Sequence, residues 1–218
     1  MAGHDSDGAG SSGREPVEEG PTLNRQLTLD DILDLRAYER ERDALRQQVI
    51  ALKRRRRVAV GPVVTLLFEN RETIRFQIQE MARAEQMTTD AAVEAELRAY
   101  NPLIPEPGHL SATLFIELTD EAQLRHWLPR LVGIESAVEL RTADGTPLAC
   151  RPETEHESQL TRDDVTAAVH YVTWSCTPDE VAALAQGEVT LAVVHPEYRY
   201  EAALPADTLA ELLDDLRG

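Results

Sequence analysis

The residues best suited to chemistry are cations and amides that cluster early in the chain. Five consecutive cations, Lys53–Arg57, are followed by Arg71, Arg75 and Gln79. Residues four apart lie on one face of a helix, so Arg71 and Arg75 would present their guanidinium groups together. A helix start beside such cations attracts anions, because its first backbone amides are free. The pattern predicts a surface that binds an anion or a partner, formed by Arg54, Arg55, Arg56, Arg57, Arg71, Arg75 and Gln79.

A polar cluster lies in the same segment and comprises Glu69, Asn70, Gln77 and Glu80. Phe76 belongs to the apolar face, which leaves Gln77 and Glu80 near the edge of the core, where polar groups need partners. The alternative is a network of exposed ion pairs between these carboxylates and the arginines, each worth at most about 0.5 kcal/mol. From the sequence, both a polar cluster at the edge of the core and a network of exposed ion pairs remain possible.

Motifs of the common enzyme classes are missing from the sequence. It has no phosphate-binding glycine loop, dinucleotide fingerprint, serine-hydrolase elbow or H-E-x-x-H. Glu153 and His156 form an E-x-x-H in a polar loop, whereas a di-metal site needs two helical copies. Cys150 and Cys176 are too few for a four-cysteine site, and we expect both to be buried apolar residues. We predict no metal and no cofactor; an enzyme would have to use carboxylates together with His109, His170 or His195.

Charge is distributed unevenly along the chain. The formal net charge is -17, yet residues 36–85 hold 12 Lys and Arg against 7 Asp and Glu. The acidic remainder repels phosphate, which disfavours a nucleic-acid partner. Residues 1–24 lack aromatic residues and any apolar run, so we expect a disordered acidic tail and neither a signal peptide nor a membrane anchor. We therefore expect a cytoplasmic protein without a membrane partner.

The periodicity of apolar residues predicts a helical first half. A helix is expected over 28–56, and Asn70 and either Thr88 or Thr89 are suitable N-caps for two more. Residues 58–68 are rich in β-branched side chains and are interrupted by Gly61 and Pro62, which predicts a bent or edge strand.

The second half contains two similar units of strand, capped helix and strand, over 111–142 and 167–198. They predict an α+β fold with an antiparallel sheet, compatible with a ferredoxin-like arrangement, beside the long N-terminal helix and a helical pair. Coincidence is the alternative, since strand, threonine cap and helix is a common order. We expect 25–218 to form a single α+β domain; the alternative is a split near Pro105, in a proline-rich connector.

Three strings carry a resemblance to a known family: LKRRRRVAVGPVVTLLFENRETIRFQIQEMARAE, YNPLIPEPGHLSATLFIEL and VVHPEYRYEAAL. From Leu27 to the C-terminus the chain resembles an uncharacterised bacterial domain-of-unknown-function family of about 200 residues. Members tend to be encoded near rubrerythrin-like proteins and iron-sulfur proteins of the heterodisulfide-reductase type. The resemblance therefore implies a partner role in redox or peroxide defence, and no catalytic residues.

Three functions remain open. The first is a non-enzymatic accessory protein that docks through the basic segment onto a protein partner, such as an iron-sulfur or rubrerythrin-like protein. The second is a metal-dependent or redox enzyme. The third is a binder of small anions, nucleotides or nucleic acid through Arg54–Arg57, whose affinity would depend strongly on salt.

Overall fold

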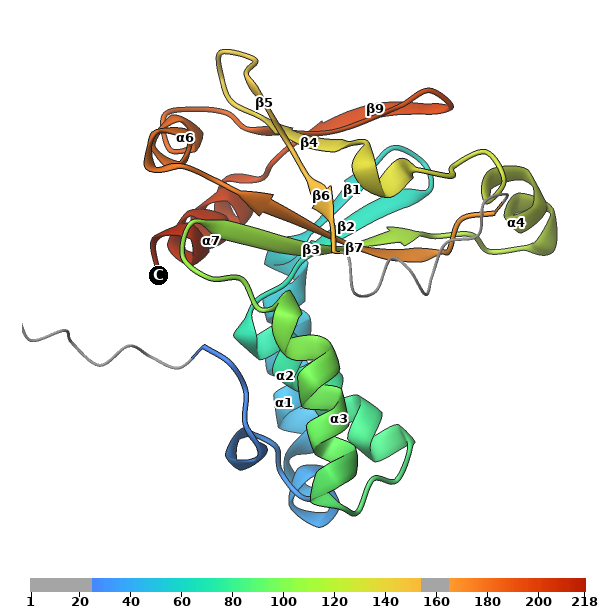
Figure 1. The fold of residues 1–218 in the computed structure, drawn as a ribbon, viewed down its shortest axis with the longest axis vertical. Helices are drawn as coiled ribbons and strands as arrows, with labels where there is room; N and C mark the ends of the chain where they lie inside the picture. The colour runs from blue at the N-terminus through green and yellow to red at the C-terminus, as the bar shows by residue number, and fades with distance from the viewer. Residues whose placement is uncertain (1–24, 154–164) are drawn as a thin grey trace, which may run out of the picture.

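The computed structural model describes residues 25–153 and 165–218, so the predicted tail and His156 lie outside the described residues. Two antiparallel sheets are stacked on each other, and three helices project from one sheet as an arm (Figure 1). The α+β class, the antiparallel pairing and the long N-terminal helix are as predicted.

The arm contains α1 (Leu35–Arg56), α2 (Arg71–Ala84) and α3 (Asp90–Tyr100). Asn70 and Thr89 cap α2 and α3 through their side chains, as predicted. The predicted start of the first helix is wrong by seven residues. Thr28 begins only a short 3-10 turn, Leu29–Asp31, and Asp34 caps α1 by accepting from two backbone amides. The chain cannot continue as a helix between them, because the backbone N–H and C=O of Leu33 bond the side chain of Gln79.

Residues 57–68 form a hairpin, which corrects the predicted single bent strand. Strand β1 (Arg57–Val60) turns back at Gly61 and pairs with β2 (Val64–Phe68). Gly61 has φ +78°, a left-handed conformation that glycine adopts without steric cost. Strand β2 then pairs with β3 (His109–Ile116), so the hairpin belongs to a sheet.

Both strand-helix-strand units are present, but each divides its strands between the two sheets. The first unit contains β3, α4 (Glu121–Trp127) and β4 (Val138–Arg141); the second contains β7 (Val169–Ser175), α6 (Pro178–Leu184) and β8 (Thr190–His195). Strands β3 and β7 pair in one sheet, whereas β4 and β8 pair in the other. The single ferredoxin-like sheet is therefore not formed.

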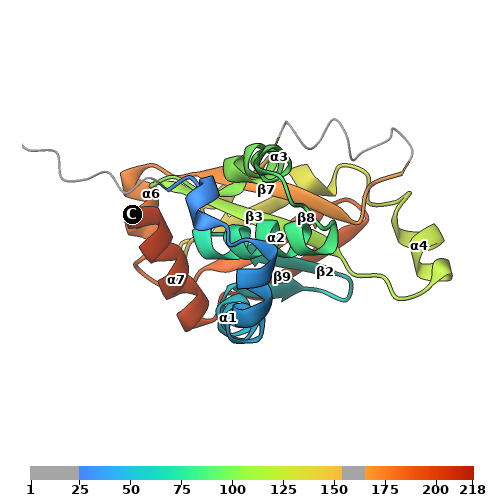
Figure 2. The same ribbon diagram turned by 90° about the horizontal axis from the view of Figure 1, so that it is seen from below.

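The remaining strands complete the sheets. The arm-side sheet has the order β1-β2-β3-β7-β6, where β6 is Arg151–Pro152. The outer sheet has the order β5-β4-β8-β9, with β5 at Pro147–Ala149 and β9 at Tyr198–Ala203. The last helix, α7 (Ala206–Arg217), contacts both α1 and β3. Figure 2 shows α1, α2 and α3 from below, with α2 between the other two.

One apolar cluster contains residues of both sheets and of α7, whereas a smaller cluster lies in the arm and its junction with the sheet. Tyr198 joins the sheets: its buried hydroxyl donates to the carbonyl of Val60 at 2.7 Å and accepts from the amides of Val63 and Val64. The β1–β2 turn is thus held by a side chain from the outer sheet. Whether 25–218 folds as one unit stays a prediction.

No helix within 25–153 and 165–218 combines the length and apolar character needed to cross a bilayer.

The β1–β2 turn provides a test of the sheet junction. A Cβ at position 61 would lie 2.4 Å from Cγ of Tyr200 and 2.6 Å from the Tyr198 hydroxyl, so Gly61→Ala is strained both by its φ and by its neighbours. We expect it to lower the free energy of unfolding by about 2–4 kcal/mol in urea titrations. Gly145→Ala is the control, because Gly145 also has positive φ (+86°) but nothing within 4 Å; it should cost only about 1–2 kcal/mol. Equal losses would contradict the close contact.

Candidate functional site

Arg56, in the middle of the basic run, is a buried structural residue. Its side chain is 1% exposed, and its guanidinium donates to the carbonyl oxygens of Phe68 and Glu69 at 2.9 and 3.2 Å. The same group pairs with Glu211 at 3.2 Å and with Asp215. Burial raises the pKa of Asp215, although Arg56 acts in the opposite direction. Arg56 therefore ties the end of α1 to the end of β2 and to α7, and its charge does not reach the surface.

The neighbouring arginines differ in their partners. Arg55 donates to Glu211 at 2.7 Å, and Arg57 pairs with Glu117 and stacks over the ring of Phe115 at 5.2 Å. Arg54 is exposed and has no hydrogen bond or ion pair with any residue that the structure describes. The run is thus not one continuous cationic surface, because Arg56 is buried and Arg55 and Arg57 are paired with acids of α7 and of the segment after β3.

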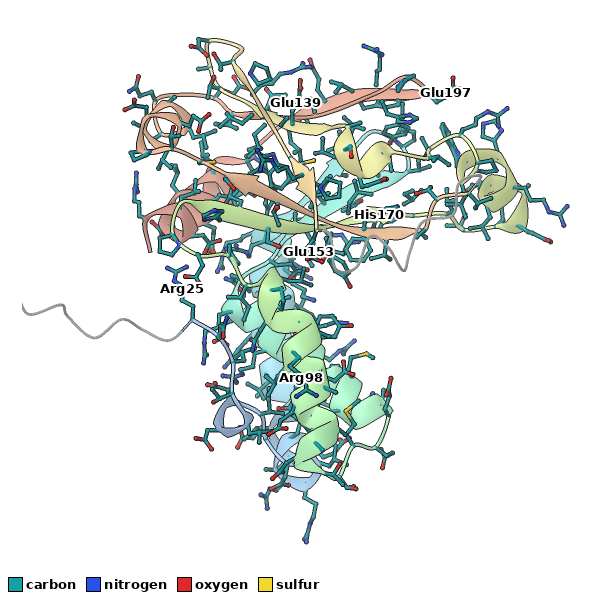
Figure 3. The ribbon with its side chains drawn as sticks, viewed as in Figure 1. Arg25, Arg98, Glu139, Glu153, His170 and Glu197 are labelled. Carbon is teal, nitrogen blue, oxygen red and sulfur yellow. The ribbon has the colours of Figure 1, made fainter. Side chains whose placement is uncertain are left out.

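Arg71 and Arg75 follow in α2 and are partly neutralised. Arg71 pairs with Asp31 at 2.5 Å, and Arg75 lies 3.6 Å from Glu72. Asn70 and Arg71 line a hollow of about 470 Å³ together with Arg25 and Asp215, at the base of the arm. Arg25, labelled in Figure 3, donates to the carbonyl of Pro105. The structure does not bring Arg54–Arg57, Arg71 and Arg75 together as one anion cradle.

Glu80 is the centre of a second ionic cluster within the arm. Tyr38, fully buried on α1, donates its hydroxyl to Glu80 at 2.6 Å, and Arg42 donates to both carboxylate oxygens at 2.9 and 3.0 Å. The Arg42 guanidinium lowers the pKa of Glu80 to about 2. Burial and the adjacent Glu80 raise the pKa of Tyr38. Tyr38 and Arg42 were not predicted from the sequence as partners of Glu80. Their four-residue spacing on α1 places them on the same face of the helix and could have indicated a shared partner.

Glu69 and Gln77 line a partly open cavity of about 230 Å³ between the arm and the arm-side sheet. Glu69 is 6% exposed; Thr113 donates to its carboxylate at 2.6 Å, and Thr73 donates to the other oxygen. Further cavity walls that the sequence missed are Lys53, Tyr100, Phe115 and Tyr171. Leu67, Thr113 and Tyr171 are cross-strand neighbours on β2, β3 and β7. In β3 and β7, polar residues alternate with apolar ones, and successive side chains of a strand point to opposite faces of the sheet. This alternation indicates that the polar residues share one face of the sheet, which is the face toward the helices.

A separate groove of about 290 Å³ runs between α1 and α2 on the arm. Its apolar walls are Leu45, Val49, Leu52 and Phe76, and its polar rim includes Gln48 and Arg75. Gln79, although predicted as a binding residue, is 4% exposed and uses its amide to hold the backbone of Leu33.

Among the described residues, Cys150 is buried, Cys176 is half-buried, and His170 and His195 have internal partners. Burial raises the pKa of both Cys150 and Cys176 to about 11, so each stays a thiol at neutral pH. His170, labelled in Figure 3, is buried in the arm-side sheet 3.8 Å from Glu135, and His195 bonds the carbonyl of Val132. No group of three His, Cys, Asp or Glu side chains could hold a metal ion in the described part of the chain.

Removing the Arg56 side chain tests its structural role. Arg56→Ala leaves Asp215 and two carbonyl oxygens without their buried partner, so we expect a loss of about 3–5 kcal/mol in the free energy of unfolding. Arg54→Ala, at the exposed position, should change it by less than about 0.5 kcal/mol. Comparable urea midpoints for the two variants would show that Arg56 does not join the elements.

Glu80 predicts a specific pH dependence. Its pKa is about 2 in the folded protein against an ordinary 4.5, so its contribution is complete above pH 4.5 and is lost as the pH falls toward 2. Glu80→Gln should therefore melt at a lower temperature than the wild type at pH 6, and the difference should shrink between pH 4.5 and 2. Glu94→Gln, at an exposed α3 position, is the control and should show little difference at any pH. A Glu80→Gln difference that stays constant with pH would contradict the assignment.

Comparison with known proteins supports a shared fold and shows no activity. The chain is similar to a crystal structure of a protein of unknown function from Burkholderia pseudomallei K96243, with 39% sequence identity and a TM-score of 0.81. The similarity covers 88% of this chain and 99% of that chain. No curated protein matches the sequence. A family model, "Protein of unknown function (DUF3501)", matches residues 26–216, and the chain therefore belongs to that family.

Proposed function

We propose that this protein is a non-enzymatic accessory protein that binds another protein through the α1–α2 groove of its arm. The observation that carries the proposal is an apolar groove between α1 and α2. These two cation-rich helices belong to the arm that projects from the sheet (Figure 1). Leu45 and Leu52 are only half-buried there, and Gln48 is exposed. A groove between two helices is a common seat for an amphipathic helix.

The charge around the groove indicates the chemistry of the partner. Residues 44–56 of α1 contain five cations and no acidic residue. Arg55, Arg56 and Arg57 are paired with acids of the protein itself, and Arg75 lies 3.6 Å from Glu72, which also lines the groove. Arg46, Lys53 and Arg54 on α1 have no acidic partner among the described residues. We therefore expect an amphipathic helix with apolar anchors and acidic flanks, attracted by charge and held by apolar contact. The proposed docking surface is therefore the α1–α2 groove, and not the arginine run that the sequence predicted.

The resemblance to the family motivates the rest of the proposal. We propose an iron-sulfur or rubrerythrin-like partner in a bacterial redox or oxidative-stress system, and the cytoplasm as the compartment. A non-enzymatic role is supported by the thiol state of both cysteines and by the internal partners of His170 and His195.

A charge-matched pair of variants tests the groove. In Gln48→Glu/Arg75→Glu, two groove residues become acidic; in Ala95→Glu/Arg98→Glu, the same change in charge is placed on α3, where Arg98 projects from the arm (Figure 3). Tagged wild type and both variants would be used for anaerobic pull-down from the source bacterium with quantitative mass spectrometry. We expect one partner whose recovery falls at least about 10-fold with the groove variant only.

The contact itself is then mapped with a photo-crosslinking residue at position 48. The crosslinked peptide of the partner should be an acidic amphipathic helix. Equal recovery with both variants, a crosslink to a basic or extended segment, or no partner in any sample would contradict the proposal.

A further inference from the structure

Glu69 is a buried carboxylate without a cation. It is 6% exposed, and both of its oxygens accept only hydroxyl groups, from Thr113 and Thr73. Arg56 bonds the carbonyl oxygen of Glu69 and not its carboxylate. Within 25–153 and 165–218, no Lys, Arg or His lies within ion-pair distance of Glu69. Buried charges in proteins are ordinarily paired, because the low-dielectric interior penalises an isolated one.

The unpaired carboxylate belongs to a residue that lines the cavity between the arm and the arm-side sheet. The cavity measures about 230 Å³, which is below the roughly 300–1,000 Å³ of pockets for drug-sized ligands, so it fits a smaller molecule. Its walls come from α1, α2, α3, β2, β3 and β7, a set of elements that fixes its shape from several sides.

The other walls favour a positive charge. Tyr100, Phe115 and Tyr171 contribute aromatic rings, whose faces attract cations, and Arg57 already lies over the Phe115 ring at 5.2 Å. Tyr171 shares a hydrogen bond with Tyr100, and burial raises its pKa to about 12, so it stays a neutral phenol at physiological pH. Gln77 adds an amide that can bond a polar group of a ligand.

Lys53 also borders the cavity and is the alternative source of positive charge. Its ammonium nitrogen lies 5.8 Å from the centre of the Phe76 ring, on the side of the α1–α2 groove, and makes no ion pair with Glu69. The carboxylate therefore remains available to a ligand.

We infer that this cavity binds a small organic amine, with Glu69 as the counter-ion of its ammonium group and the aromatic rings around it. Such a site is independent of the partner groove and would add ligand binding to the protein. An amine fits better than an anion, which would face the Glu69 carboxylate, and better than a metal ion, which would find too few ligands there.

The inference is tested by ligand-observed NMR with benzylamine, tyramine, putrescine and agmatine, each beside a neutral analogue such as benzyl alcohol for benzylamine. We expect at least one amine to bind wild type at least 10-fold more tightly than its neutral analogue. Glu69→Gln should abolish that preference while circular dichroism shows an unchanged fold. In separate protein-observed spectra, shifts of the backbone amides of Thr113 and Tyr171 should locate the amine in the cavity.

Two further variants keep the result decisive. Gln77→Trp fills the cavity from a half-buried position and leaves Glu69 in place, so it should also abolish binding, even if Glu69→Gln fails to fold. Gln48→Glu/Arg75→Glu alters the partner groove and should leave amine binding unchanged. The inference is overturned if no amine binds the wild type, or if amines bind both cavity variants as tightly as the wild type.

Discussion

The structure depends on one buried guanidinium. Arg56 ends α1, yet its side chain bonds the last residues of β2 and two acids of α7. Among the described residues, α1 contacts the body mainly at β2 and α7, where Arg55 also pairs with Glu211, and the rest of α1 packs on α2. Two carbonyl oxygens and two carboxylates offset the desolvation of the buried guanidinium. Because these partners surround a planar group, they fix its orientation as well as its position.

The two proposed sites follow from that junction. The groove lies along the outer side of α1 and α2, while the cavity lies where the arm meets β2, β3 and β7. Arg56 donates to the backbone carbonyl of Glu69 and so helps to position a residue that lines the cavity. Lys53 borders the cavity, and its ammonium lies over the ring of Phe76, which lines the groove.

Local signals in the sequence predicted local structure well. The caps at Asn70 and Thr89 and both strand-helix-strand units were readable, because short-range hydrogen bonds and periodicity determine them. The assignment of strands to two sheets was not readable, since it depends on contacts between distant residues such as Tyr198 and Val60. The same limit applies to the site. The run of cations predicted that Arg56 lies on the surface with its neighbours. Only the fold shows that two acids from α7 lie beside it.

The central claim is that Arg56 locks the arm to the body. Hydrogen-deuterium exchange of wild type and Arg56→Ala, under conditions where both are folded, tests it most directly. The account predicts faster exchange at the end of α1, the end of β2 and α7, with β8 and β9 unchanged. Unchanged exchange at these three elements, or an equal increase throughout the chain, would contradict it.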